Sequence, residues 1–219
     1  MSDAFWNGLW SGIFELIALG LIAGWINLIY QRIRSRQSLR HDLINDIDAF
    51  SAALYKPRKM YQHLIKAQSD SRSTTIQESD DEPIEQAPEL AAFRLRHVCL
   101  DEFTAAAGQF RAIQVKMVPL FGFDVELFAY YLSVWNAVRA VRKRMERGVD
   151  LYEAHETEAS SDALYRLLDQ FRYRVQVTRS VKDKPRLLRP PSEVEEQIRA
   201  RSKEITQEFM RSNINSQRA

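Results

Sequence analysis

The amino-acid sequence predicts an all-α protein: a single N-terminal transmembrane helix continues into a stalk, and a cytosolic antiparallel helical bundle follows. Only seven Gly and seven Pro occur in 219 residues, which is too few for a β fold with a turn about every ten residues. An apolar run near the N-terminus has roughly the length of a membrane span. Beyond it, apolar residues recur three and four positions apart, which is typical of amphipathic helices.

The predicted membrane anchor, residues 1–35, contains the apolar run of residues 13–30, IFELIALGLIAGWINLIY. A helix needs about 20 apolar residues to span the hydrocarbon core of a bilayer. Trp6 and Trp10 precede this run and Trp25 lies towards its other end, and aromatic side chains favour the two membrane interfaces. The run and its aromatic flanks therefore predict a spanning helix.

Two other interpretations of this run are weaker. A cleaved signal peptide needs basic residues before its apolar part, but this chain begins MSDAFW. A helix buried in a soluble core carries polar residues on one side. Leu16 to Ile26 has no charged side chain, and Trp25 is its only hydrogen-bonding one.

The charges that flank the run predict its orientation. Arg32, Arg34, Arg36 and Arg40 follow the apolar residues, whereas Asp3 is the only charged side chain before them. Positive residues remain on the cytoplasmic side of a membrane. We therefore expect a single-pass protein of the cell (inner or plasma) membrane, with its N-terminus outside and its C-terminal domain in the cytosol.

Glycines form a predicted helix–helix interface within the anchor. Gly8 and Gly12 make one GxxxG pattern, and Gly20 and Gly24 make a second in the same four-residue register. Small residues on one helical face let a second membrane helix approach closely, which predicts a homo-oligomer or a partner transmembrane helix. The alternative is that glycine is simply frequent in membrane helices.

Glu15 is a possible intramembrane polar site. A carboxylate at membrane depth is costly, and its presence there points to a function. The alternative, which we favour, is that Glu15 lies near enough to the outer headgroups to stay hydrated.

An amphipathic stalk helix is predicted for residues 36–67. The anchor should run into it without interruption, as one helix from about Phe5 to Tyr55, because no Gly or Pro lies between Gly24 and Pro57. Pro57 is expected to break or kink this helix. Its apolar stripe consists of Leu39, Leu43, Ile47, Phe50 and Leu54.

Residues 68–89 are predicted to form an acidic flexible linker. They carry seven acidic residues and one Arg, and they lack the apolar residues that would order them. The following residues 90–149 carry nine basic and five acidic residues, so weak electrostatic contact between the two segments is expected. The net charge of the whole chain is only +2, which argues against a nucleic-acid partner.

The core of the helical bundle is predicted in residues 90–181. Apolar residues keep helical spacing from Leu100 to Met117 and again from Leu127 to Met145. Pro119 and Gly122 punctuate the chain between the two helices. Asp124 is the predicted N-cap of the second helix, and Gly148 is its predicted C-cap.

The C-terminal third holds one ambiguous segment and a last helix. A helix should start near Asp162, but residues 171–177 alternate with a period of two, so helix and strand both remain open there. We favour helix because no partner strand is evident. Residues 182–219 are predicted as a Pro-containing connector and a C-terminal helix, starting at a capping box of Ser192 and Glu195.

No catalytic, cofactor-binding or metal site is predicted. The four histidines show no pair at the four-residue spacing of a helical metal site. His97 and Cys99 lie about 200° apart around a helix, so they cannot share one metal ion. Cys99, the single cysteine, is expected to be a small core residue in a reducing compartment.

A basic patch is predicted near the end of the helix that precedes Gly148. Its simplest explanation is that cations are favourable at a helix C-terminus. The functional alternative is contact with anionic lipid or with an acidic partner. The patch consists of Arg139, Arg142, Lys143, Arg144 and Arg147.

These features together predict a membrane-tethered, non-enzymatic interaction or regulatory module. Its expected partners are the lipid bilayer and a second membrane helix. One alternative is an oligomerising membrane effector that perturbs the bilayer or conducts through it. The other is an enzyme with an unrecognised all-α site. Glu15 would favour the effector if it faced the interface lined by the glycines.

Overall fold

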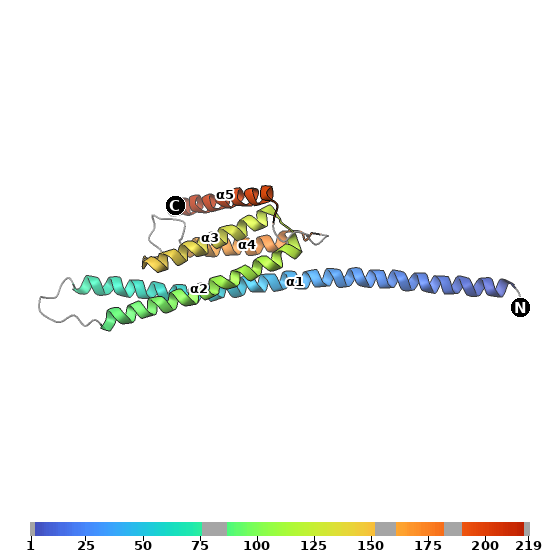
Figure 1. The fold of residues 1–219 in the computed structure, drawn as a ribbon, viewed down its shortest axis with the longest axis horizontal. Helices are drawn as coiled ribbons and strands as arrows, with labels where there is room; N and C mark the ends of the chain where they lie inside the picture. Colours follow the sequence, from blue (N-terminus) through green and yellow to red (C-terminus); the bar gives the residue numbers. More distant parts are fainter. Residues whose placement is uncertain (1–2, 76–86, 152–160, 182–189, 217–219) are drawn as a thin grey trace. The chain divides into compact units, whose positions relative to one another are not determined.

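A computed structural model describes the backbone of residues 3–75, 87–151, 161–181 and 190–216, and the side chains of residues 21–70, 90–151, 163–181 and 190–209. Within these ranges the chain is helical and contains no strand, so the all-α prediction is confirmed. Residues 171–177 are helical as well. The helices are α1 (Asp3–Thr75), α2 (Ala87–Phe121), α3 (Val125–Arg147), α4 (Ser161–Val177) and α5 (Ser192–Ser216) (Figure 1).

The chain divides into two units, Met1–His41 and Asp42–Ala219. The first unit is the N-terminal part of α1, in which every residue from Leu21 to Tyr30 is exposed. Among the residues described, no helix is long and apolar enough to cross a membrane. The side chains of residues 5–20, which belong to the predicted span, lie outside the described set.

Helix α1 confirms the predicted continuity of the helix from Phe5 to Tyr55, but the expectation that Pro57 breaks it is wrong. The helix passes through Pro57 and continues to Thr75. A proline inside a helix removes one hydrogen bond and favours a kink. Pro57 is buried here, and Leu54 in the turn before it and Tyr61 in the turn after it are fully buried. Packing on both sides of the proline therefore holds the helical conformation.

The predicted flexible linker, residues 68–89, is too long at both ends. Residues 68–75 belong to α1 and residues 87–89 to α2, while residues 76–86 lie outside the part of the chain that is described. Low hydrophobicity prevents a segment from forming its own core, but it does not stop a polar helix from extending out of a packed one. Ser69, whose hydroxyl donates to the Lys66 carbonyl at 2.7 Å, lies in this extension.

The turn between α2 and α3 follows the sequence prediction closely. Helix α2 includes Pro119 and ends at Phe121, where Gly122 adopts a left-handed φ of 64°. The Asp124 carboxylate accepts a hydrogen bond from the Leu127 N–H at 2.8 Å, so the predicted N-cap of α3 is confirmed.

The other end of α3 also follows its prediction. Gly148 has a φ of 72°, and its N–H donates to the last carbonyls of the helix, which confirms the predicted C-cap. A side chain at this position would meet the guanidinium of Arg96, which lies against the glycine and donates to the Glu146 carbonyl at 3.0 Å. The site therefore favours glycine for its left-handed backbone conformation, whereas the flexible end of the Arg96 side chain can shift to admit a methyl group.

Helix α5 begins one residue earlier than a capping box requires. Ser192 is already helical, and the Glu195 N–H donates to the Pro191 carbonyl at 3.0 Å. The Glu195 carboxylate pairs with Arg199 at 2.6 Å. The predicted helix is therefore present, but its N-terminus is set by Pro191 rather than by a reciprocal pair of Ser192 and Glu195.

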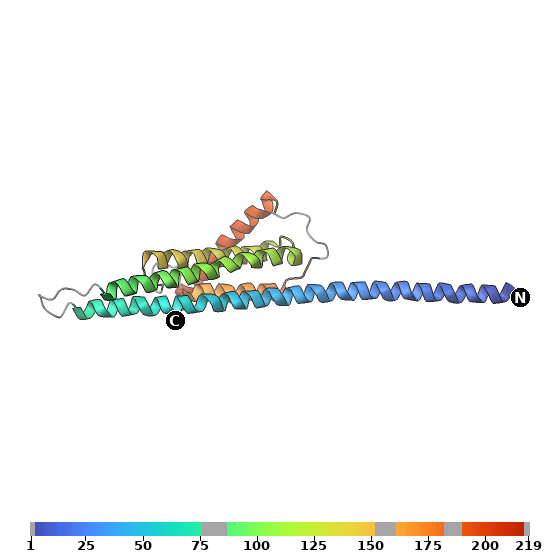
Figure 2. The same cartoon turned by 60° about the horizontal axis from the view of Figure 1, so that its bottom comes forward.

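The second unit is a helical bundle in which α2 runs back along the C-terminal part of α1 and α3 and α4 complete the core (Figures 1 and 2). Two contacts show that α4 is antiparallel to α1. Asp48 pairs with Arg172 at 2.9 Å, and Tyr55 lies edge-on to Tyr165 at 6.4 Å between ring centroids. Residue numbers rise along one helix as they fall along the other.

Phe110 of α2 lies at the centre of the core and is fully buried. Its ring stacks on Tyr131 of α3 at a centroid distance of 4.6 Å and lies 4.6 Å from Phe50 of α1. Trp135 of α3 and Phe171 of α4 each lie 6.2 Å away. These separations are typical of favourable aromatic pairs, so one side chain joins four helices.

Replacement of Phe110 by Ala should lower the free energy of unfolding by about 3–5 kcal/mol, because it removes a large buried ring and leaves a cavity among four helices. Denaturant unfolding followed by far-UV circular dichroism measures this change. Val115 lies on the same helix and is 72% exposed, so Val115→Ala is the matched control and should change the value by less than about 0.5 kcal/mol. Equal effects of the two substitutions would contradict the central role of Phe110.

Candidate functional site

Helix α5 crosses α3 obliquely rather than lying along it (Figure 2). Of its apolar side chains between residues 192 and 209, Ile198 and Ile205 are the two that are buried in the bundle. Val194 and Phe209 are partly buried at either side of them. The apolar contact of α5 is therefore narrow, and polar groups make up much of the remaining attachment.

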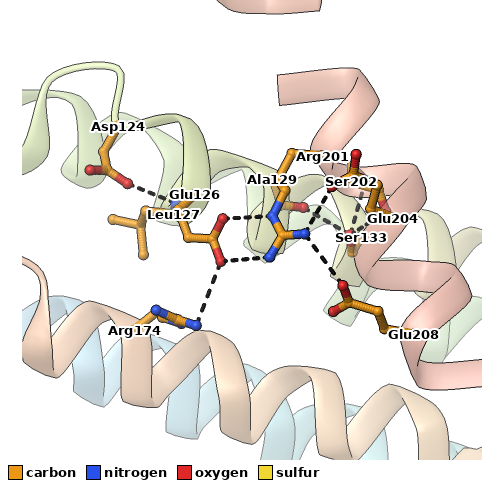
Figure 3. Close-up of polar contacts among 10 residues, drawn as sticks. All are labelled: Asp124, Glu126, Leu127, Ala129, Ser133, Arg174, Arg201, Ser202, Glu204 and Glu208. Atoms are coloured by element: carbon orange, nitrogen blue, oxygen red, sulfur yellow. Dashed lines mark hydrogen bonds and ion pairs between the residues drawn. The ribbon is translucent and has the colours of Figure 1, made fainter. Parts of the chain in front are cut away.

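The first polar attachment is a buried pair of hydroxyls, Ser133 of α3 and Ser202 of α5 (Figure 3). The two oxygens lie 2.9 Å apart, and the residues are 1% and 2% exposed. Ser133 also lies within hydrogen-bond distance of the Ala129 carbonyl at 2.9 Å. Because buried hydroxyls without partners are costly, this arrangement satisfies both groups where the two helices cross.

The second polar attachment is a two-pronged ion pair between Arg201 of α5 and Glu126 of α3 (Figure 3). The guanidinium donates to the two carboxylate oxygens at 2.8 and 3.2 Å. Arg174 of α4 lies 3.6 Å from the same carboxylate. Glu126 therefore connects α3, α4 and α5.

These contacts perturb both partners of the pair. The hydrogen bonds from Arg201 hold the pKa of the Glu126 carboxyl below its usual value, and the charges of Arg201 and Arg174 act in the same direction. The hydrogen bonds with Glu126 and Glu204 raise the pKa of Arg201. Glu204 and Glu208 lie 2.9 and 3.5 Å from the guanidinium, so Arg201 is surrounded by carboxylates.

A half-open cleft of about 800 Å³ lies beside this attachment, between α3, α4 and α5. Apolar side chains, neutral polar side chains and cations line it, and no carboxylate is among the described residues that do so. The apolar lining is Leu132, Ala137, Ala140, Ala163, Leu167 and Phe209. The neutral polar lining is Ser133, Asn136, Ser202, Thr206 and Gln207. The cations are Arg139, Arg199 and Lys203.

This composition favours an anionic ligand with an apolar part. Volumes of about 300–1,000 Å³ with mostly apolar walls and a few polar groups are typical of small-molecule sites. Arg139, Arg199 and Lys203 are all exposed or partly exposed, so their charged groups are accessible from solvent. Arg199 also pairs with Glu195, but this pair is exposed and can exchange for another anion at little cost.

The predicted basic patch loses one of its five members, because Arg139, Arg142, Lys143 and Arg147 are exposed on α3 whereas Arg144 is buried. Arg144 is only 8% exposed, and it donates to the Asp150 carbonyl at 2.6 and 3.1 Å, so its place in an exposed patch is wrong. Arg142 pairs with Glu146 at 2.8 Å, as residues four apart on a helix commonly do. Arg139 lines the cleft, and Lys143 and Arg147 are exposed.

Tyr61 was not singled out by the sequence, yet it ties α1 to the end of α3. Its hydroxyl donates to the Val149 carbonyl at 2.9 Å and lies 3.5 Å from the Arg144 carbonyl. Burial raises the pKa of the Tyr61 hydroxyl to about 12, so it remains a donor throughout the physiological range. The only sequence signal for this role was a tyrosine in phase with the stalk stripe.

The remaining candidate residues divide between the described part of the chain and the rest. Gly8, Gly12, Glu15 and Gly20 lie outside the residues whose side-chain surroundings are described, whereas Gly24 has open space where a side chain would project. Cys99 is fully buried, which confirms it as a core residue, and burial raises the pKa of its thiol. No cluster of three potential metal ligands occurs among the residues that are described.

The cleft itself was not predicted. The sequence signals that could have indicated it are Arg199 and Lys203, which lie one turn apart on the polar side of α5, and the neighbouring Ser202. The contribution of α3 and α4 depends on the crossing of the helices, which no local pattern encodes. Comparison with protein-family models, with curated proteins and with solved structures gave no match.

Glu126→Gln should loosen α5 by roughly 1 kcal/mol, because it removes the charge that Arg201 and Arg174 share at a partly exposed site. The carboxyl pKa is lower in the folded protein than in the unfolded chain. The ionised Glu126 carboxylate therefore contributes its full stabilisation at pH values above its pKa in the unfolded chain. This stabilisation is lost as the pH falls through its pKa in the folded protein. Hydrogen exchange of the α5 amides, measured against pH, should show this acid loss in the original protein and not in the variant.

Glu195→Gln is the matched control for this experiment, because Glu195 pairs with Arg199 across the exposed face of α5. It should leave the amide exchange rates of residues 198–205 unchanged within experimental error. If Glu195→Gln and Glu126→Gln accelerated exchange equally, the special role of Glu126 in attaching α5 would be refuted.

Proposed function

We propose that this protein is a membrane-tethered, non-enzymatic interaction or regulatory module: a single N-terminal span in the cell membrane holds a cytosolic helical bundle. The observation that carries the proposal is the exposure of the apolar residues that begin at Leu21. Trp25 and Leu28 are 67% and 66% exposed, and Leu21 is 71% exposed. Exposure of such an apolar surface to water is unfavourable, whereas its contact with lipid or with another membrane helix is favourable.

The distribution of residues around this part of α1 supports the same proposal. At about 100° per residue, the large apolar side chains from Leu21 to Tyr30 cover roughly 200° of the circumference. The remaining arc holds Ala23, Gly24 and Asn27, and none of these ten residues is charged. A helix without a charged face is typical of a membrane span.

The orientation and location of the proposed span follow from its flanks. Four arginines lie within the ten residues after Tyr30, and only Asp3 is charged before the apolar run. Positive residues next to a span remain in the cytoplasm. The bundle, from Asp42 onwards, is then cytosolic, in agreement with a single cysteine that is buried and reduced.

A second membrane helix is the proposed partner of the span. Gly20, Ala23, Gly24 and Asn27 lie on one side of an ideal helix, opposite the large apolar side chains. Small residues permit close packing of two helices, and an amide in that interface can form a hydrogen bond across it. Space is open at Gly24 in the single chain, as close packing of a second copy requires.

Ile22→Arg with Ile26→Arg should release the protein from the membrane, because each arginine near the centre of a span costs about 2.5–3.5 kcal/mol. Extraction of isolated membranes at alkaline pH measures the retained fraction. The matched control is Gln31→Arg with Ser38→Arg, which adds the same charge to the same helix after the proposed span. The control should remain in the membrane fraction, and its loss would refute the proposed boundary.

Orientation is tested in the same preparation with single cysteines on a Cys99→Ala background. Cys99 itself is buried and cannot serve as the reporter. A membrane-impermeant maleimide added to intact cells should label Ser2→Cys and leave Ser216→Cys unlabelled until the cells are opened. The opposite pattern would place the bundle outside the cell.

Gly20→Leu with Gly24→Leu should weaken self-association of the span, because the larger side chains keep the two helices apart. A membrane two-hybrid reporter, with expression matched by immunoblot, measures this association. Ile22→Ala with Ile29→Ala changes the opposite side of the helix and should leave the signal unchanged. A signal that survives the glycine replacements would show that the GxxxG pattern does not form the interface.

A further inference from the structure

We propose that the cleft between α3, α4 and α5 binds an anionic amphiphile of the fatty-acid class, a carboxylate head on an aliphatic chain. This proposal goes beyond the membrane tether, since it concerns only residues of the second unit, and it stands without the tether. Three properties of the cleft carry it: its volume, the sign of its charges, and the satisfied state of its polar floor.

The volume of about 800 Å³ lies in the range of small-ligand sites. It is open on one side, so a ligand can enter without unfolding the bundle. Leu132 and Ala140 of α3, Leu167 of α4 and Phe209 of α5 supply apolar wall on three sides. An aliphatic chain gains about 0.8 kcal/mol for each methylene group that leaves water, so this wall can hold one.

The charges of the lining have one sign. Arg139 projects from α3, and Arg199 and Lys203 project from successive turns of α5. No carboxylate is found among the lining residues that the structure describes. Two acidic residues of α5, Glu204 and Glu208, surround Arg201, which does not line the cleft. Glu195 pairs with Arg199 in an exposed ion pair and offsets one of the three cations, so Arg139 and Lys203 carry the main attraction for an anion.

The hydroxyl groups at the floor of the cleft already have hydrogen-bond partners within the protein. Ser133 and Ser202 satisfy each other, and Thr206 donates to the Ser202 carbonyl at 2.9 Å. An apolar chain that covers these three hydroxyl groups therefore leaves their hydrogen bonds intact, while the exposed side chains of Asn136 and Gln207 remain in contact with water. A head group that needs positive charge can meanwhile remain at the mouth, beside Arg139 and Lys203.

An acidic protein helix is the main competing occupant, because it also matches positive charge. It is less favoured because a standard protein interface buries about 800 Å² on each partner, whereas this cleft is lined by fourteen residues and enclosed on three sides. A short chain with one anionic end fits such a space more completely. The experiment separates the two occupants.

The test uses the full-length protein in phosphatidylcholine nanodiscs and a palmitic acid with a diazirine in its chain. After irradiation, mass spectrometry locates the cross-linked peptides. Labels are expected in residues 132–140 and 202–209, and unlabelled palmitate should suppress them. The corresponding diazirine fatty alcohol should label these peptides at least about fivefold less, because it lacks the charge. Equal labelling by the alcohol would overturn the proposal.

Variants assign the binding to the cleft. Arg139→Gln with Lys203→Gln should lower the cleft labels at least about fivefold, and Ala140→Phe should do so by filling the space. The matched control, Lys143→Gln with Arg147→Gln, removes two exposed cations of α3 that do not line the cleft and should have no effect. If the first two variants label like the original protein, the proposal is wrong.

Two further results of the cross-linking experiment distinguish the failure of this proposal from the failure of the membrane tether. Labels within residues 13–30 report contact of the proposed span with lipid, so their absence would count against the tether and leave the cleft proposal intact. Suppression of the cleft labels by an acidic helical peptide but not by palmitate would assign the cleft to a protein partner and overturn the proposal. Thermal unfolding by circular dichroism confirms that each variant is folded, and the comparison of acid with alcohol needs no variant.

Discussion

The bundle depends on the contacts of one ring, that of Phe110. Its neighbours come from α1, α3 and α4, so the position of each of these helices is defined relative to a single point on α2. Aromatic packing is well suited to this role because rings are large, rigid and selective in their mutual angles. The ion pair between Asp48 of α1 and Arg172 of α4 joins two of the helices that contact this ring.

Helix α5 is held by a different kind of interaction. Two isoleucines give it little apolar contact, and its specificity comes from a hydroxyl pair and from Glu126. Elements with few buried apolar contacts open at lower free energy than the core around them. The cleft lies between this helix and the α3–α4 pair, so the attachment of α5 also sets the width of the cleft.

The sequence predicted what local chemistry determines. Asp124 and Gly148 were assignable because a cap needs a particular residue at a particular place in the chain. The helical state of residues 171–177, against their period of two, was assignable from the missing partner strand.

Pro57 and the linker ends were misassigned because helix propensity is a local property, whereas packing decides whether a helix continues. In the sequence Arg144 is one of several basic residues in a row, and no local pattern marks it as buried. It is buried because the chain after α3 turns back and places the Asp150 carbonyl beside its guanidinium. The cleft could not be predicted because it arises where three helices cross.

The bond between Tyr61 and Val149 has a consequence for the order in which the protein is made. The two residues are separated by 88 positions, so the hydroxyl waits for its acceptor until the ribosome has added most of the chain. Until α2 and its Phe110 have been made, the face of α1 that carries Leu43 and Phe50 also has no partner, although it is fully buried in the finished protein. Synthesis proceeds at about 5–20 residues per second, which leaves this face uncovered for several seconds. The apolar face of α1 is therefore made before the side chains that cover it in the folded bundle.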